Sequence, residues 1–196
     1  IHQTIAEDDL NVKIACALPG LTSGYGPSHQ ATEDLALMRA IPGLMVIDPC
    51  DAHEIAQVVP AIAAHRGPVY MRLLRGQVPL VLDEYGYRFP IGKAQMLRDG
   101  RDVLVVSSGL LTMRALEAAQ ALAADSVDVG VLHVPTIKPL DVETLRRECG
   151  RSGRLVVVAE NHSAAGGLGE AVATALLEAG VAPRFARIAL PDAFLD

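Results

Sequence analysis

Short apolar runs alternate along this chain with longer segments in which apolar residues recur every three or four positions. The apolar runs predict strands that are buried on both faces, as in a parallel sheet covered by helices. The periodic segments predict amphipathic helices. Strands that alternate with helices form right-handed βαβ units, so the pattern predicts an α/β fold. The predicted strands are residues 11–18, 44–48, 68–73, 93–98, 102–107, 127–133, 154–160 and 184–190, and the predicted helices are 33–39, 52–64, 112–124, 142–149 and 170–178, with 1–9 as the end of another helix.

The alternation is interrupted after the first three predicted strands. Residues 77–92 are rich in proline and glycine, and we interpret them as a linker between a first domain at 1–76 and a second domain at 93–196. The second domain has a complete α/β pattern, and Asp99-Gly100 predicts a hairpin-like turn near its start. The first domain has few strands and helices for a doubly wound domain, and Ile1 is not an initiator residue. We therefore expect part of the first domain to precede Ile1.

A glycine-rich turn, Gly24–Gln30, follows the first predicted strand and is called the His29 turn below. Its sequence is Gly-Tyr-Gly-Pro-Ser-His-Gln. Glycine adopts backbone conformations that other residues avoid and proline fixes φ, so we expect this turn to hold His29 rigidly at the start of a helix. Ser28 is expected to cap that helix. His29 could then act as an acid or base near neutral pH, or it could be a structural loop residue.

Further polar residues are predicted at the carboxyl ends of parallel strands, where ligands bind in such sheets. Arg75 could hold a phosphate or carboxylate through two hydrogen bonds, or it could form a surface ion pair. Glu160 and His162 alternate at a strand end, as a metal pair or an acid–base pair would. A zinc site is not expected there, because no third ligand is close in sequence. Residues 166–169 precede a predicted helix, as a phosphate cradle would. They lack the GxGxxG spacing and a downstream acidic ribose partner, so close packing of a helix on a strand explains their glycines better than a nucleotide site does.

Composition limits the class of protein. Hydrophobic residues make up 51% of the 196 residues, enough for a sizeable core. The formal net charge is −6 and no block of lysine or arginine is present, so we expect no nucleic-acid partner. No apolar run is long enough to predict a membrane span. The three cysteines, Cys16, Cys50 and Cys149, show no CxxC spacing and predict reduced thiols in a cytoplasmic protein.

Five segments, read in order, resemble the second half of the transketolase family of thiamine diphosphate enzymes. The resemblance covers essentially the whole chain and is greatest to the small, C-terminal subunit of split transketolases, with 1-deoxyxylulose-5-phosphate synthase as a related family. The five segments are residues 24–54, 67–76, 91–109, 133–141 and 159–173.

The resemblance implies that 1–76 is the C-terminal portion of a pyrimidine-binding α/β domain. Residues 93–196 would form a transketolase C-terminal-type three-layer α/β/α domain. The implied cofactors are thiamine diphosphate and Mg²⁺, with the diphosphate and the metal held by a domain that is absent here. The glutamate that activates the aminopyrimidine and the aromatic residue that stacks on it would precede Ile1. The implied partners are a large subunit carrying the diphosphate-binding domain and further copies of this chain, which pair across the pyrimidine and C-terminal domains.

The resemblance also implies roles for single residues. His29 matches the family's loop histidine, which faces the substrate and helps proton transfer, and is therefore the implied catalytic residue. The implied substrate-binding residues are Arg75, which matches an arginine that grips a sugar phosphate, together with Tyr25 and Ser28 in the turn. Tyr25 stands where the family usually has an acidic residue that binds a sugar hydroxyl. Ala17 stands where a histidine helps to bind phosphate, so the substrate is not expected to be an ordinary pentose phosphate.

The implied function is transfer of a two-carbon ketol or acyl unit from a donor to an aldehyde acceptor, by a chain that is inactive without its partner. Two related enzymes remain alternatives, 1-deoxyxylulose-5-phosphate synthase and the β subunit of a 2-oxoacid dehydrogenase. An alternative of another class is a non-catalytic assembly subunit, because Tyr25 and Ala17 replace working residues.

Overall fold

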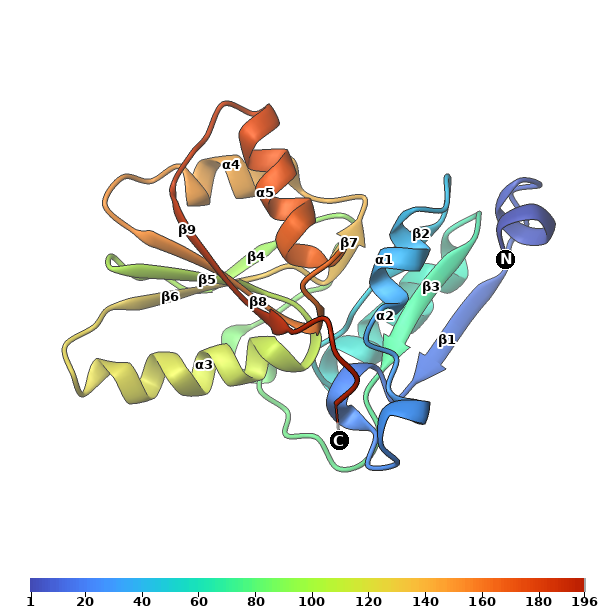
Figure 1. Cartoon of the computed structure of the whole chain (residues 1–196), viewed down its shortest axis with the longest axis horizontal. Helices are drawn as coiled ribbons and strands as arrows, with labels where there is room; N and C mark the ends of the chain where they lie inside the picture. The colour runs from blue at the N-terminus through green and yellow to red at the C-terminus, as the bar shows by residue number, and fades with distance from the viewer. Residues whose placement is uncertain (196) are drawn as a thin grey trace.

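The computed structural model describes residues 1–195 and contains two sheets, which Figure 1 shows side by side. The strand order is β1-β3-β2-β7 in the first sheet and β4-β6-β5-β8-β9 in the second. Neighbouring strands are parallel except in the pairs β2–β7 and β4–β6, which confirms the predicted α/β fold. The strands are β1 Lys13–Ala17, β2 Met45–Ile47, β3 Val69–Leu73, β4 Gln95–Arg98, β5 Val103–Ser107, β6 Val129–His133, β7 Thr136–Lys138, β8 Leu155–Ser163 and β9 Arg184–Leu190, and the α-helices are α1 Asp34–Arg39, α2 Ala52–Ala64, α3 Gly109–Ala123, α4 Val142–Cys149 and α5 Leu168–Glu178.

Helices cover both faces of the second sheet. Figure 1 shows α3 on one face and α4 with α5 on the other, which is the three-layer arrangement expected for this part of the chain. None of the helices in the described range, 1–195, is both long enough and apolar enough to cross a membrane.

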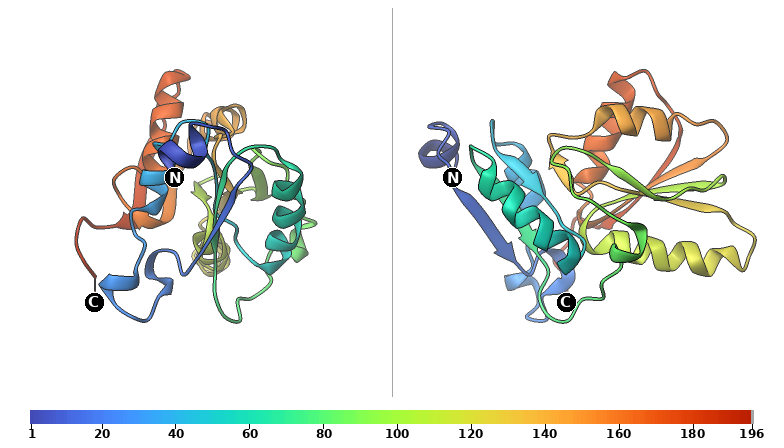
Figure 2. Two further views of the ribbon diagram at one scale, coloured as in Figure 1. Left: turned by 90° about the vertical axis from the view of Figure 1, so that its right-hand side faces the viewer. Right: turned by 180° about the vertical axis from the view of Figure 1, so that it is seen from behind.

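The two sheets share a hydrophobic cluster. Val46 on β2 and Tyr70 on β3 belong to the same buried cluster as Val106 on β5. Because side chains alternate along a strand, the other face of the first sheet carries a separate set, which packs against Val58 and Ile62 of α2. Figure 2 shows α2 lying along that sheet. The first sheet therefore lies between α2 and the second part of the chain.

The expected hairpin at Asp99-Gly100 is wrong, because β4 pairs with β6 and not with β5. The turn crosses the start of β6 at a contact between two glycines. A Cβ atom on Gly100 would lie 2.1 Å from the backbone nitrogen of Gly130. After β4 the chain crosses β6 at this contact, and β5 therefore pairs with the edge of β6 opposite to β4.

The short strand β7 was not predicted. It lies in the sequence between β6 and α4, yet it pairs antiparallel with β2 of the first sheet. Its Thr136 hydroxyl accepts a hydrogen bond of 3.0 Å from the backbone N–H of Gly92. The first sheet is thus completed by residues from beyond the predicted linker.

The predicted linker, 77–92, contains one helical turn, Asp83–Tyr85, and is attached to α2. Leu82 and Tyr87 are fully buried. The carboxylate of Asp51 caps the start of α2 and also accepts hydrogen bonds from the backbone of Val81 and Leu82, at 2.7 and 2.9 Å. Leu82 and Tyr87 also share a buried cluster with Met113 of α3, so this segment packs against both domains.

Candidate functional site

The His29 turn lies beyond the carboxyl ends of β1 and β3, which end side by side at Ala17 and Leu73. Gly26 has a φ of 72°, a conformation that glycine adopts without strain, and it leads into the single helical turn Pro27–His29. The side chain of His29 is exposed to solvent. The turn therefore presents the imidazole at the edge of the sheet where ligands bind in parallel folds.

The expectation that His29 stands at the start of the following helix is wrong. Residues 30–32 are extended or bent and pair with Pro19 through Ala31, so α1 begins only at Asp34. Ser28 does not cap α1 either. Its hydroxyl lies 2.9 Å from Nδ1 of His29 instead.

The contact between Ser28 and His29 orients the imidazole. When the Ser28 hydroxyl donates to Nδ1 of the neutral ring, the proton of the ring resides on Nε2, which can donate a hydrogen bond outward. The Tyr25 ring lies 5.4 Å from the His29 ring, centroid to centroid, and is tilted by 49°. Tyr25 is 67% exposed, so its hydroxyl is also open to a ligand. The structure thus brings together three of the four predicted site residues.

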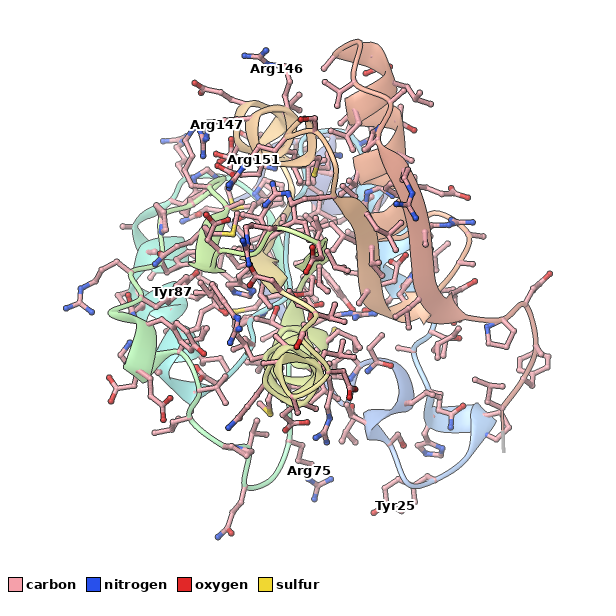
Figure 3. All side chains as sticks on the ribbon, turned by 90° about the vertical axis from the view of Figure 1, so that its left-hand side faces the viewer. Tyr25, Arg75, Tyr87, Arg146, Arg147 and Arg151 are labelled. Atoms are coloured by element: carbon pink, nitrogen blue, oxygen red, sulfur yellow. The ribbon has the colours of Figure 1, made fainter. Side chains whose placement is uncertain are left out.

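The fourth predicted site residue, Arg75, follows β3 and is exposed. Figure 3 shows Arg75 and Tyr25 projecting from the same end of the molecule. Within residues 1–195 the guanidinium of Arg75 makes no hydrogen bond and no ion pair. It is therefore available to an anionic group, as expected if it binds substrate.

Oε2 of Glu160 lies 4.0 Å from Nδ1 of His162, but both side chains are buried and bound to backbone groups, so they are not exposed as an acid–base pair or a metal site would be. Glu160 accepts hydrogen bonds from the backbone of Leu168 and Gly169, at 2.5 and 2.9 Å, and so caps the start of α5. A Cβ atom on Gly167 would lie 1.9 Å from Oε2 of Glu160, which confirms that these glycines serve close packing. Burial raises the pKa of Glu160, although the two N–H groups act in the opposite direction.

His162 is held in one tautomer by backbone groups. Its Nδ1 donates to the carbonyl of Ser163 at 2.7 Å, and its Nε2 accepts from the N–H of Ala36 in α1 at 3.2 Å. The side chain is fully buried, and burial lowers its pKa. Protonation would remove the acceptor that Ala36 uses, so the fold favours the neutral form of His162.

We expect this arrangement to make stability depend on pH. Because the pKa of His162 is lower in the folded state, the unfolded chain binds a proton first as the pH falls through the ordinary histidine value near 6.5. The stability that wild-type protein gains over His162→Gln should therefore be greatest at pH 7.5 and should decline by up to about 1.4 kcal/mol per pH unit below 6.5. Denaturant unfolding of the wild type and His162→Gln between pH 5 and 8 measures this difference in the free energy of unfolding. His65→Gln is the control for replacing a histidine elsewhere. If wild type and His162→Gln differ in free energy of unfolding by the same amount at every pH in this range, the prediction is contradicted.

A buried ion-pair network at the start of α1 was missed. The guanidinium of Arg72, which is 1% exposed, donates to Asp34 at 2.9 and 2.5 Å and lies 3.5 Å from Asp48. Tyr70 donates to the same Asp34 carboxylate at 2.6 Å. Burial raises the pKa of Asp34, but the hydrogen bonds and charge of Arg72 outweigh it and the pKa is lowered. The alternation of Tyr70 and Arg72 in an apolar strand could have indicated a shared buried partner.

A second buried cluster was also missed. The carboxylate of Glu54 on α2 accepts from the hydroxyl of Tyr87 at 2.5 Å and from the backbone of Cys50 at 2.6 Å. It also lies 3.0 Å from Nε2 of His133 on β6, whose Nδ1 contacts Thr112 of α3 at 2.8 Å. This cluster joins the two domains on the side away from the shared hydrophobic core, and no local sequence signal indicates it.

The described residues, 1–195, offer no cluster of metal-binding side chains. The buried carboxylates of Asp34, Glu54 and Glu160 are all occupied by internal partners. No group of three His, Cys, Asp or Glu side chains between residues 1 and 195 is placed to hold a metal ion. The side chains of Tyr25, Ser28 and His29 in the His29 turn are exposed and therefore open to a ligand.

Known proteins resemble this chain along its whole length. Two family models match it, the transketolase pyrimidine-binding domain over residues 1–81 and the transketolase C-terminal domain over residues 92–196. The transketolase family protein y4mN of Sinorhizobium fredii is 69% identical over 98% of this chain and 56% of its own length. The 6-deoxy-6-sulfo-D-fructose transketolase subunit SqwH of a Clostridium species is 40% identical over 97% of this chain and 59% of its own length.

A solved structure agrees with these relatives. A split-gene transketolase, described as an inactive β4 tetramer, is 41% identical and superposes with a TM-score of 0.90, over 100% of this chain and 63% of that one. The chain therefore spans somewhat more than half the length of the two curated relatives. On the matched domains, the identities and the shared structure, the chain belongs to the transketolase family.

Proposed function

We propose that this chain is part of the small subunit of a split transketolase-like transferase. The enzyme would transfer a two-carbon ketol or acyl unit from a donor to an aldehyde acceptor. The observation that carries this proposal is the exposed His29, held by Ser28 at the carboxyl ends of β1 and β3 in a chain of the transketolase family.

The side chains of the site would act on the substrate's oxygen atoms and charge. Nε2 of His29 would donate a hydrogen bond to the ketone or hydroxyl oxygen of the donor and pass a proton as that oxygen changes charge. Ser28 would keep the ring in the tautomer that allows this. Arg75 would bind an anionic group of the substrate through its unpaired guanidinium.

The cofactor of the proposed reaction is thiamine diphosphate with Mg²⁺, since the family depends on it. When bound, it would supply the electron sink for breaking the donor's carbon–carbon bond. We propose that a large partner subunit holds the diphosphate and the metal, which the lack of a three-ligand cluster of His, Cys, Asp or Glu within residues 1–195 supports. This chain would then be inactive alone. The description of the 41%-identical relative as an inactive β4 tetramer supports both this expectation and pairing between copies of the small chain.

The substrate is proposed to differ from an ordinary pentose phosphate. Tyr25 and Ala17 stand where the family's hydroxyl acceptor and phosphate-binding histidine are expected, and replacing a polar partner of this kind changes binding by about 1–3 kcal/mol. The name of the 40%-identical SqwH refers to a sulfonated sugar, which supports variation of the substrate's anionic group among relatives of this chain.

A thermal-shift titration tests the proposed division of the site. Thiamine diphosphate with Mg²⁺ should raise the melting temperature of the full-length small chain only when the large subunit is present. A ligand at one hundred times its Kd stabilises the protein that binds it by about 2.7 kcal/mol. Thiamine without the diphosphate is the control and should give little shift. An equal shift for the small chain alone, or no shift with the partner, would contradict the proposal.

The other candidate function is a non-catalytic assembly subunit. It is favoured because Tyr25 and Ala17 stand at positions where the family has residues that bind substrate.

The related enzymes, 1-deoxyxylulose-5-phosphate synthase and the β subunit of a 2-oxoacid dehydrogenase, differ from the main proposal in donor and acceptor. Assays of the assembled complex with ketose and 2-oxoacid donors would separate these enzymes.

A further inference from the structure

The end of β8, Asn161–Ser163, reaches from the second sheet to the loop that carries the His29 turn. The amide oxygen of Asn161 accepts a hydrogen bond from the backbone N–H of Leu21 at 3.0 Å, and its amide nitrogen donates to the carbonyl of Pro19 at 3.3 Å. Asn161 is 8% exposed. One buried side chain therefore holds the backbone on both sides of Gly20, where the loop leaves β1.

Gly20 is shaped to receive this side chain. Its φ is 57°, and a Cβ atom placed there would lie 2.5 Å from the Cγ atom of Asn161. The asparagine amide thus lies directly against the backbone of Gly20, with no room for a side chain between them. The contact needs both residues, the glycine for its space and conformation and the asparagine for its two hydrogen bonds.

The same three residues of β8 also hold the loop where it enters α1. The N–H of Ser163 donates to the carbonyl of Thr32 at 2.7 Å, and His162 accepts from Ala36 as described above. The backbone carbonyl of Asn161 accepts from Arg72 at 3.2 Å, and Arg72 in turn holds Asp34. Both ends of the loop are therefore bound to one short segment of the second domain.

The turn between these ends has little support of its own. Tyr25, Ser28 and His29 are exposed, and no atom lies within 4 Å of the position that a Cβ atom would take on Gly24 or Gly26. The position of the imidazole therefore depends on how firmly the ends of the loop are held.

We infer that Asn161 is a positioning residue for the proposed reaction, one that acts from the second domain by fixing the loop that presents His29. The inference rests on the proposed role of His29. Asn161 touches neither substrate nor cofactor, and its effect passes through Pro19, Gly20 and Leu21. A displacement of about 1 Å at a reacting group can lower a rate by about 10²-fold.

The test uses the full-length small chain assembled with its large subunit. Asn161→Ala removes both hydrogen bonds, whereas Asn161→Asp keeps the acceptor for Leu21 and removes the donor to Pro19. In hydrogen exchange, the amide of Leu21 should exchange at least about tenfold faster in Asn161→Ala and should stay protected in Asn161→Asp. Turnover should fall about 10- to 100-fold in Asn161→Ala through kcat, with the KM for the donor little changed.

A double-mutant cycle with Gly20→Ala checks that the contact acts as one unit. Gly20→Ala should accelerate exchange of the loop in the wild-type background, because its methyl group meets the Asn161 amide. In the Asn161→Ala background that steric conflict is gone, so the further effect of Gly20→Ala should be smaller than in the wild type. Thr112→Val is the matched control, since it breaks a buried contact within the second domain, between α3 and β6, that does not reach the loop.

Three results would overturn the inference. The first is that hydrogen exchange of the Leu21 amide is unchanged in Asn161→Ala. The second is that Thr112→Val accelerates this exchange as much as Asn161→Ala does. The third is that Asn161→Ala loosens the loop but leaves kcat unchanged, in an enzyme that His29→Ala inactivates. If His29→Ala leaves turnover intact, the proposed function fails. The exchange data then still decide whether Asn161 anchors the loop, so failure of the inference and failure of the proposed function can be told apart.

Discussion

Replacing His29 with alanine is expected to lower kcat/KM of the assembled enzyme by about 10²–10⁴-fold, the usual contribution of a positioned acid–base group. The reason is that Nε2 of the exposed His29 side chain is the proposed proton donor, because Ser28 engages the other ring nitrogen, Nδ1. Stability should change little, because the side chain is exposed and its only described polar contact is with Ser28. Steady-state kinetics with the natural donor, together with a melting curve of the same sample, measure both effects.

Two variants make this experiment specific. His65→Ala removes a histidine at the end of α2 and should leave kcat/KM unchanged. Ser28→Ala keeps the imidazole but removes the hydroxyl contact that orients it, so kcat/KM should fall less than in His29→Ala. Unchanged turnover of His29→Ala in a fully assembled complex would instead support the non-catalytic assembly subunit.

Replacing Arg72 with methionine is expected to lower the free energy of unfolding by about 3–5 kcal/mol, as happens when one partner of a buried ion pair is removed. Asp34 and Asp48 would both remain buried near the vacated position. Burial already raises the pKa of Asp48, and without Arg72 it should rise further. Denaturant unfolding of the full-length chain, followed by circular dichroism, measures the decrease in stability.

The pH dependence provides a second readout for Arg72. In the wild type the pKa of Asp34 is lower in the folded state, so its contribution to stability is present above its ordinary pKa and is lost as the pH falls through the folded value. Arg72→Met should remove this contribution. Arg75→Met is the matched control, because Arg75 is exposed and unpaired within the described residues and should change stability by no more than about 0.5 kcal/mol. A similar decrease for both variants would contradict the assignment.

Much of the architecture could be predicted because its cause is local. The helix α4 and the strand β9 have the predicted bounds, since Asp141 caps the former and the latter is an unbroken extended run. The order of strands in the second sheet could not be predicted, because it depends on a contact between Gly100 and Gly130, thirty positions apart. The three residues of β7 are too few to give a periodic pattern.

The part of the candidate site that could be predicted is the part with a local sequence signal. The His29 turn has a distinctive local sequence, and the family resemblance gave its residues a role. Glu160 and His162 were misinterpreted because their partners, the start of α5 and Ala36, are brought to them only by tertiary packing. Arg72 was missed because its partners Asp34 and Asp48 are more than twenty positions away in sequence and reach it only when α1 and β2 pack beside β3.

The pairing of β7 with β2 limits how this protein can be divided. If the chain were cut within residues 77–92, the N-terminal piece would keep β2 but lose the strand that covers its edge. The bare edge would expose the backbone of Val46 and Ile47, and such edges recruit strands from other molecules. The separated N-terminal piece should therefore aggregate or require the C-terminal piece for solubility, even though the sequence suggests two independent domains. A gene split at that point would yield two polypeptides that must fold together.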